Sequence, residues 1–132
     1  MSKTLKEIYN YDFIENAETS LLKDINSLLN KTIDELDVHD VCVLIRQEMF
    51  LDIAIPKAIN IVKDNHAAGD YYDYCLLVNL ANLESPLSNY KEQFESLIQI
   101  LEKDFNSINF ELDSDKEDYL ESIKRIKEKT HL

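Results

Sequence analysis

Two aspartates and three tyrosines follow the only glycine of the chain, in the segment Gly69-Asp70-Tyr71-Tyr72-Asp73-Tyr74. Tyrosine offers a large, rigid contact area with a polar tip, and it is enriched among residues that dominate the binding energy of protein interfaces. The carboxylates add negative charge, which attracts a basic partner. Tyrosines and carboxylates together are therefore typical of a surface that binds another protein. The segment therefore predicts a partner-binding surface bordered by Asp70, Tyr71, Asp73 and Tyr74. The alternative location is the acidic C-terminal region around Glu111 to Glu121.

The alternative for the same tyrosines is a structural role, in which one or two rings pack onto the core and fix the turn. It fits Tyr72 best, because this residue lies just ahead of the apolar pair Leu76-Leu77. We therefore expect Tyr72 to be buried, and its replacement by alanine to reduce stability rather than binding.

Residue patterns typical of catalysis are missing from the sequence. It has no nucleophilic serine between glycines, no phosphate loop, no dinucleotide-binding motif and no paired cysteines at zinc spacing. Carboxylates are so abundant that some must lie near one another, which a solvated acidic surface explains without any acid-base function. We predict no enzyme, and neither catalytic residues nor a cofactor.

A metal site has one weak candidate. His39 and Cys42 are one helical turn apart and could join Cys75 or His66, since imidazole and thiolate both suit zinc. His39 lies between Asp37 and Asp40, however, where a solvated side chain in the first turn of a helix is the simpler interpretation. We therefore predict no metal.

The chain is strongly acidic, with 26 acidic and 14 basic residues and a formal net charge of -12. Such a surface repels nucleic acid and anionic lipid, so a charged partner should be basic, although acidity also serves solubility. No apolar stretch approaches a membrane span, and the first residues lack the apolar centre of a secretory signal. These features predict a cytoplasmic protein with no membrane contact, in which Cys42 and Cys75 stay unpaired inside apolar runs.

The elements that must position these residues are helices. One glycine and two prolines are too few for a strand-rich fold, and 132 residues suit one domain with a real core, spanning 1–132. We expect an all-α bundle of about five to six helices, preceded by a short turn or helix within residues 1–14. Apolar residues recur at helical spacing over about 16–30, from Asp37 to Met49, and over about 55–64, 76–83, 86–105 and 114–129.

Local signals place the ends of these helices. Asp37 is an expected N-cap, Pro56 suits a first helical turn, and Ser114 to Glu117 has the sequence of a capping box ahead of an inward-facing Leu120. Gly69 predicts a turn over 65–72 that needs either a positive φ or a close backbone approach.

The centre of the chain, from Leu36 to Leu83, resembles the immunity proteins of bacterial contact-dependent growth inhibition (CDI) systems. Four blocks carry the resemblance in order: Ile33 to Val41, Leu44 to Gln47, Ile55 to Ala58, and Gly69 to Tyr72 with Leu76-Leu77. The resemblance implies a protein that binds the C-terminal toxin domain of an effector delivered by a neighbouring cell and blocks it. It does not imply which toxin is bound, and the negative charge favours a basic nuclease. The other possibility from another class is an acidic helical adaptor or structural subunit of a cytoplasmic complex.

Overall fold

In the computed structural model, residues 3–132 are described and form seven α-helices joined by turns and loops. The helices are α1 (Leu5–Tyr9), α2 (Ser20–Leu29), α3 (Val38–Gln47), α4 (Leu51–Asp64), α5 (Cys75–Ala81), α6 (Lys91–Asp104) and α7 (Asp113–Thr130). Three 3-10 turns lie at Ile33–Glu35, Ser88–Tyr90 and Phe105–Ser107. No strand forms within this part of the chain, so the all-α prediction is confirmed. The expected number of five to six helices was too low. The capping box of Thr4 and Glu7 makes the short turn or helix expected within residues 1–14 a helix, α1.

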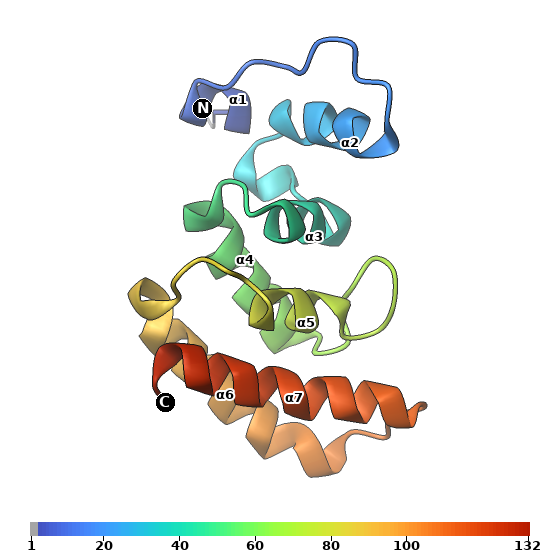
Figure 1. Cartoon of the computed structure of the whole chain (residues 1–132), viewed down its shortest axis with the longest axis vertical. Helices are drawn as coiled ribbons and strands as arrows, with labels where there is room; N and C mark the ends of the chain where they lie inside the picture. Colours follow the sequence, from blue (N-terminus) through green and yellow to red (C-terminus); the bar gives the residue numbers. More distant parts are fainter. Residues whose placement is uncertain (1–2) are drawn as a thin grey trace.

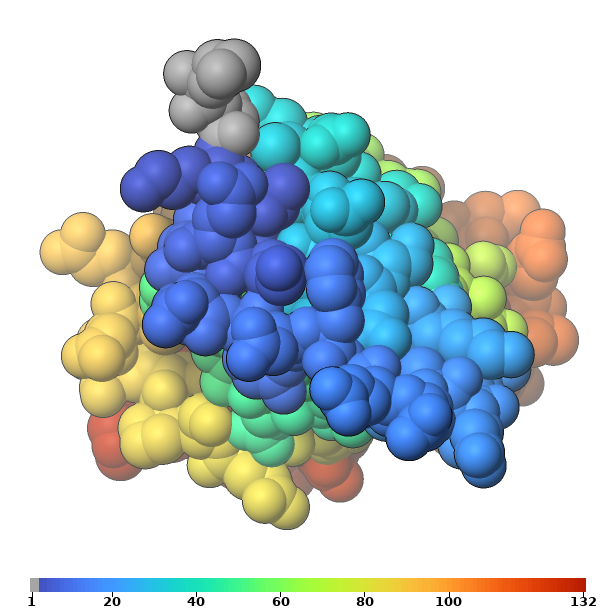
Figure 2. Space-filling model, turned by 90° about the horizontal axis from the view of Figure 1, so that it is seen from above, coloured from blue at the N-terminus to red at the C-terminus, as the bar shows by residue number. Residues whose placement is uncertain are grey.

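The helices are stacked along the long axis of the molecule (Figure 1). The helices α1 and α2 form one end, α3 follows, then α4 and α5, and α6 with α7 forms the other end. The contacts follow the same order, since α2 packs on α3, α3 on α4 and α5, and these two on α6 and α7 respectively. Seen from above, α1, α2 and their connection cover much of the upper end (Figure 2).

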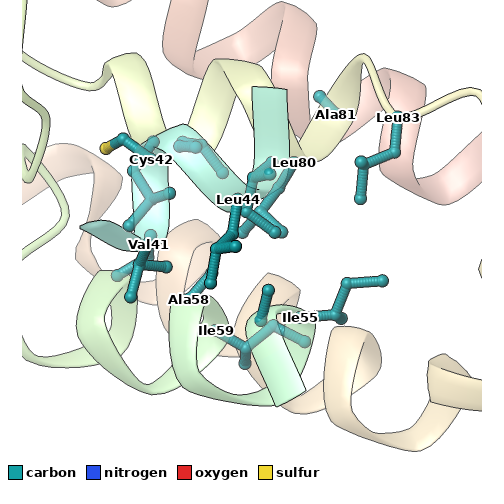
Figure 3. Close-up of a cluster of buried hydrophobic side chains, with 14 of the residues drawn as sticks. Val41, Cys42, Leu44, Ile55, Ala58, Ile59, Leu80, Ala81 and Leu83 are labelled. Carbon is teal, nitrogen blue, oxygen red and sulfur yellow. The ribbon is translucent and has the colours of Figure 1, made fainter. Parts of the chain in front are cut away.

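The core lies between α3, α4 and α5, where apolar side chains from the three helices meet (Figure 3). Its labelled members are Val41, Cys42, Leu44, Ile55, Ala58, Ile59, Leu80, Ala81 and Leu83, all nearly or fully buried. The same buried cluster extends from Leu5 in α1 to Ile126 in α7. That residues 1–132 make a single domain stays a prediction.

The N-terminal end of α3 forms as predicted. The Asp37 carboxylate accepts a hydrogen bond from the Asp40 amide at 2.8 Å, and the Asp40 carboxylate accepts one from the Asp37 amide at 3.1 Å. Lys31 donates to the same Asp40 side chain at 2.7 Å, which pairs its buried charge. This reciprocal cap satisfies two amides that would otherwise lack partners, and so fixes where α3 begins.

Four predicted helix starts are wrong. The helix α2 begins at Ser20 rather than near 16, and α6 begins at Lys91 rather than near 86. The helix α4 begins at Leu51 after Phe50, whose φ of 50° is left-handed, so Pro56 lies inside the helix and removes one of its hydrogen bonds. The helix α7 begins at Asp113, and the residue before it, Leu112, makes no side-chain cap. The expected capping box of Ser114 and Glu117 therefore falls inside the helix. Leu120, expected to face inward, is 45% exposed.

Candidate partner-binding surface

The connection between α4 and α5 is tied down by its own backbone. The Tyr74 amide donates to the Ala67 carbonyl at 2.9 Å, and the Leu76 amide donates to the Ala68 carbonyl at 3.2 Å. Gly69 has no positive φ, but a Cβ there would collide with the Tyr72 carbonyl and lie 2.9 Å from the Cys75 sulfur. The turn predicted over 65–72 therefore needs glycine because other atoms approach its Cα closely. It does not need glycine for a left-handed backbone angle.

The side chain of Asp70 points into the molecule and is 5% exposed. Arg46 of α3 donates from two guanidinium nitrogens to its two carboxylate oxygens, both at 2.8 Å. The Cys75 thiol donates at 3.2 Å, and His39 Nδ1 lies 3.0 Å from the same carboxylate. Burial alone would raise the pKa of Asp70, but the hydrogen bonds from Arg46 and Cys75 and the charge of Arg46 hold it well below its usual range. Asp70 is thus a buried anion that joins α3 to α5.

His39 lies between two carboxylates. Its Nε2 is 3.1 Å from Asp24 of α2, while its Nδ1 is turned to Asp70. The hydrogen bond to Asp24 raises the pKa of His39 most, and burial opposes it less than the two acids together support it. With an acceptor at each nitrogen, the ring is best matched as the doubly protonated cation.

The three tyrosines of the segment have three different environments. The Tyr71 ring is 74% exposed and lies beneath the Arg46 guanidinium, 4.5 Å from the ring centroid. Tyr72 is 50% exposed, so the prediction that it is buried is wrong. Tyr74 is 7% exposed, and its ring packs 5.5 Å from Phe110 and 5.8 Å from Tyr119. A left-handed φ of 70° at Tyr74 turns its ring inward just before α5 begins.

The four predicted site residues therefore lie on one loop but face different ways. Tyr71 and Asp73 are exposed, whereas the Asp70 carboxylate and the Tyr74 ring are turned inward. The inward pair shapes the loop and leaves Tyr71 and Asp73 to present their side chains to solvent. The partner-binding role of these residues stays a prediction.

Residues of α7 and of the segment before it extend the same surface, which the local sequence around Tyr71 could not indicate. After burial and Cys75, the charge of Asp118 contributes to raising the pKa of Tyr72. Burial and then the charges of Asp115, Asp73 and Glu111 raise the pKa of Tyr74. We call the exposed residues Tyr71, Tyr72 and Asp73, together with Glu111 and the half-buried Asp118, the tyrosine surface. It combines aromatic rings with carboxylates from two segments far apart in the chain.

The structure also brings together Cys42, Cys75 and Asp70, whose ligand atoms all lie within 4.8 Å of one another. His39 approaches this group only through Asp70, and His66 instead contacts the Val62 carbonyl and Asp104. The chemistry does not suit a metal, because burial raises the pKa of Cys42 to about 12 and Arg46 already neutralises Asp70. The group is better matched to a hydrogen-bonded joint.

Comparison with protein-family models gives one decisive result. The model of the CDI immunity proteins matches residues 7–100, which is more than half of the chain. The chain belongs to this family. The resemblance inferred from the sequence is therefore confirmed, and comparison with curated proteins gave no match.

The family match divides the tyrosine surface. It includes Tyr71, Tyr72 and Asp73 as well as the Arg46–Asp70 pair, whereas Glu111 and Asp118 lie beyond its end at residue 100. The matched region thus contains the loop, and α7 together with the segment before it supplies the further acids. Among the helices of residues 3–132, none is long and apolar enough to span a membrane.

Proposed function

We propose that this immunity protein binds the toxin domain of a CDI effector through the tyrosine surface, and that the toxin is a basic nuclease. The family match supports the class of partner. The observation that carries the location is the placement of two exposed tyrosines on a loop whose buried Asp70 accepts hydrogen bonds from Arg46 and Cys75. A rigid loop loses little conformational entropy on binding, so its aromatic contacts contribute more of their energy to affinity.

Charge supports a basic toxin. The chain carries a net charge of -12. Asp73 follows the tyrosine pair in the sequence, the charge of Asp118 acts on Tyr72, and that of Glu111 acts on the adjoining Tyr74. A nuclease needs a positively charged groove for phosphates, and an acidic surface with projecting rings complements such a groove. Attraction between opposite charges also speeds association, which suits an inhibitor that must act before the toxin reaches its substrate.

The test is binding of the purified chain to its cognate CDI toxin domain, measured by calorimetry. We expect a one-to-one complex that Asp73→Lys weakens by about tenfold or more, because the change places a cation against a basic partner. Raising salt from about 0.05 M to about 0.5 M should weaken the native complex as well. Asp12→Lys is the matched control, since Asp12 is an exposed acid between α1 and α2, and it should bind normally.

Two results would separate the parts of the proposal. Equal affinity of Asp73→Lys and Asp12→Lys at low salt would place the partner elsewhere. A toxin domain that binds the chain but cleaves neither DNA nor RNA would contradict the nuclease assignment and leave the interface standing. Failure of the chain to bind this toxin at all would contradict both and favour the adaptor alternative.

A further inference from the structure

Six side chains form a regular stripe along the outer face of α7. Its members recur at alternating intervals of four and three residues, which is the spacing at which helices pair side by side. They are Asp113, Glu117, Leu120, Lys124, Lys127 and His131. The helix α7 rests on α5 and α6 through other side chains, including the buried Tyr119 and Ile126. Leu120, near the middle of the stripe, is 45% exposed.

Two open hollows flank Leu120 along this face. They have volumes of about 590 and 520 Å³, and both are lined by Leu120 and Lys124. The larger one also contains Ile123 and the exposed Leu132, so its lining is partly apolar. An apolar residue between two hollows is suited to the side chains of a facing helix.

The charges of the stripe have a definite order. Asp113 and Glu117 precede Leu120, whereas Lys124 and Lys127 follow it. Two such helices side by side in antiparallel orientation would place leucine against leucine and each acid against a base. A parallel pair would place like charges together. The stripe is therefore complementary to itself under a two-fold rotation, as a symmetric dimer requires.

The stripe charges on either side of Leu120, Glu117 and Lys124, have no ion-pair partner in the part of the chain that the structure describes. By contrast, Lys127 pairs with Glu102 and Arg125 pairs with Glu121. Both side chains are exposed. They are thus free to pair across an interface.

We propose that a second copy of this chain docks on α7 in antiparallel orientation. Leu120 meets its own equivalent at the two-fold axis, and Glu117 of each copy pairs with Lys124 of the other. A helix of 18 residues is only about 27 Å long, so two such helices can bury only a small interface area. The dimer is therefore weak, and the fraction of dimer depends on protein concentration. This interface does not include Tyr71 or Tyr72, although Asp118 of the tyrosine surface lines the smaller hollow. The proposal does not depend on the identity of the toxin.

Charge reversal tests the register. The measurement is sedimentation equilibrium of the native chain and its variants. We expect Glu117→Lys and Lys124→Glu each to weaken dimerisation by about tenfold or more, since each variant places two like-charged pairs in the homodimer. An equimolar mixture of the two variants restores opposite charges at both positions, so it should dimerise like the native chain. The double variant should do the same.

Cysteine cross-linking tests the two-fold axis. Cys42 and Cys75 are buried, so Leu120→Cys introduces one accessible thiol. With oxidised glutathione as oxidant, two such thiols should form a disulfide between copies, releasing two molecules of reduced glutathione. Ser114→Cys is the control, because Ser114 is exposed on the same helix but outside the stripe. It should cross-link much more slowly.

Either of two results overturns the proposal. One is a native chain that stays monomeric at millimolar concentration. The other is a mixture of Glu117→Lys and Lys124→Glu that dimerises no better than the separate variants. Calorimetry with the toxin domain tests the proposed function separately from dimerisation. Leu120→Cys in its reduced form should bind the toxin normally, whether or not the chain dimerises.

Discussion

Arg46 and Asp70 form a two-pronged ion pair in which both guanidinium–carboxylate distances are 2.8 Å. Arg46 belongs to α3, and Asp70 lies on the loop before α5. The pair therefore fixes the loop against a helix that lies earlier in the chain. It also positions the guanidinium over the exposed ring of Tyr71. One buried anion thus orients the residue that we expect to contact the toxin.

Replacing Asp70 by asparagine should destabilise the fold by about 3 kcal/mol. The change removes one partner of a largely buried pair and leaves the Arg46 charge without its anion. Urea unfolding followed by circular dichroism measures the loss. Asp73→Asn, an equally small change at an exposed neighbour, should alter stability by less than about 0.5 kcal/mol. Equal effects of the two variants would contradict the structural role of Asp70.

The same ion pair predicts that the stability of the fold depends on pH in the acidic range. Because the folded pKa of Asp70 lies below its ordinary value of 3.8, its contribution to stability is complete above that value and is lost as the pH falls toward the folded pKa. Native protein should therefore lose stability below about pH 4 more steeply than Asp70→Asn. Parallel curves for the two proteins would argue against an ionised Asp70 in the fold.

His39 should titrate above the ordinary histidine pKa of 6.5. A raised folded pKa means that its contribution to stability is fully present below pH 6.5 and is lost as the pH rises through the folded value. Nuclear magnetic resonance of the imidazole protons against pH measures this directly. In Asp24→Asn the His39 pKa should fall, because the hydrogen bond that raises it most is weakened. A His39 pKa at or below 6.5 in the native chain would refute the cation between Asp24 and Asp70.

Tyr72 and Tyr74 should respond oppositely to alanine substitution. Tyr74→Ala removes a buried ring from contacts with Phe110 and Tyr119 and should cost about 3 kcal/mol of stability. Tyr72→Ala removes a half-exposed ring and should cost about 1 kcal/mol or less, while weakening toxin binding. Thermal melts and calorimetry measure the two effects. A larger loss of stability in Tyr72→Ala than in Tyr74→Ala would contradict these environments.

The sequence predicted the helical class and the cap at Asp37, because both depend on interactions within a few residues. It failed where the chain enters a helix through a left-handed residue without a polar cap, as Phe50 does before α4. Pro56 then suggested a start that lies too late. The same difficulty affected the tyrosines. Tyr74, the buried ring, precedes α5 with a left-handed backbone, and a tyrosine at this position does not predict such a backbone from its residue type. The acidic region from Glu111 to Glu121 was expected only as an alternative site, because its approach to the tyrosines depends on the packing of α7 on α5, which the sequence does not show.

The stacked order of the helices bears on how the molecule opens. The helices α1 and α2 form one end, and they are joined to the rest through α3 and through the stacked rings of Tyr9 and Phe50. The helices α4 and α5 instead have neighbours on both sides. Amide protons of α2 should therefore exchange with deuterium through partial opening of this end. Those of α4 and α5 should exchange only through global unfolding, and therefore more slowly. The joint at Asp70 would then be among the last parts of the molecule to lose its structure.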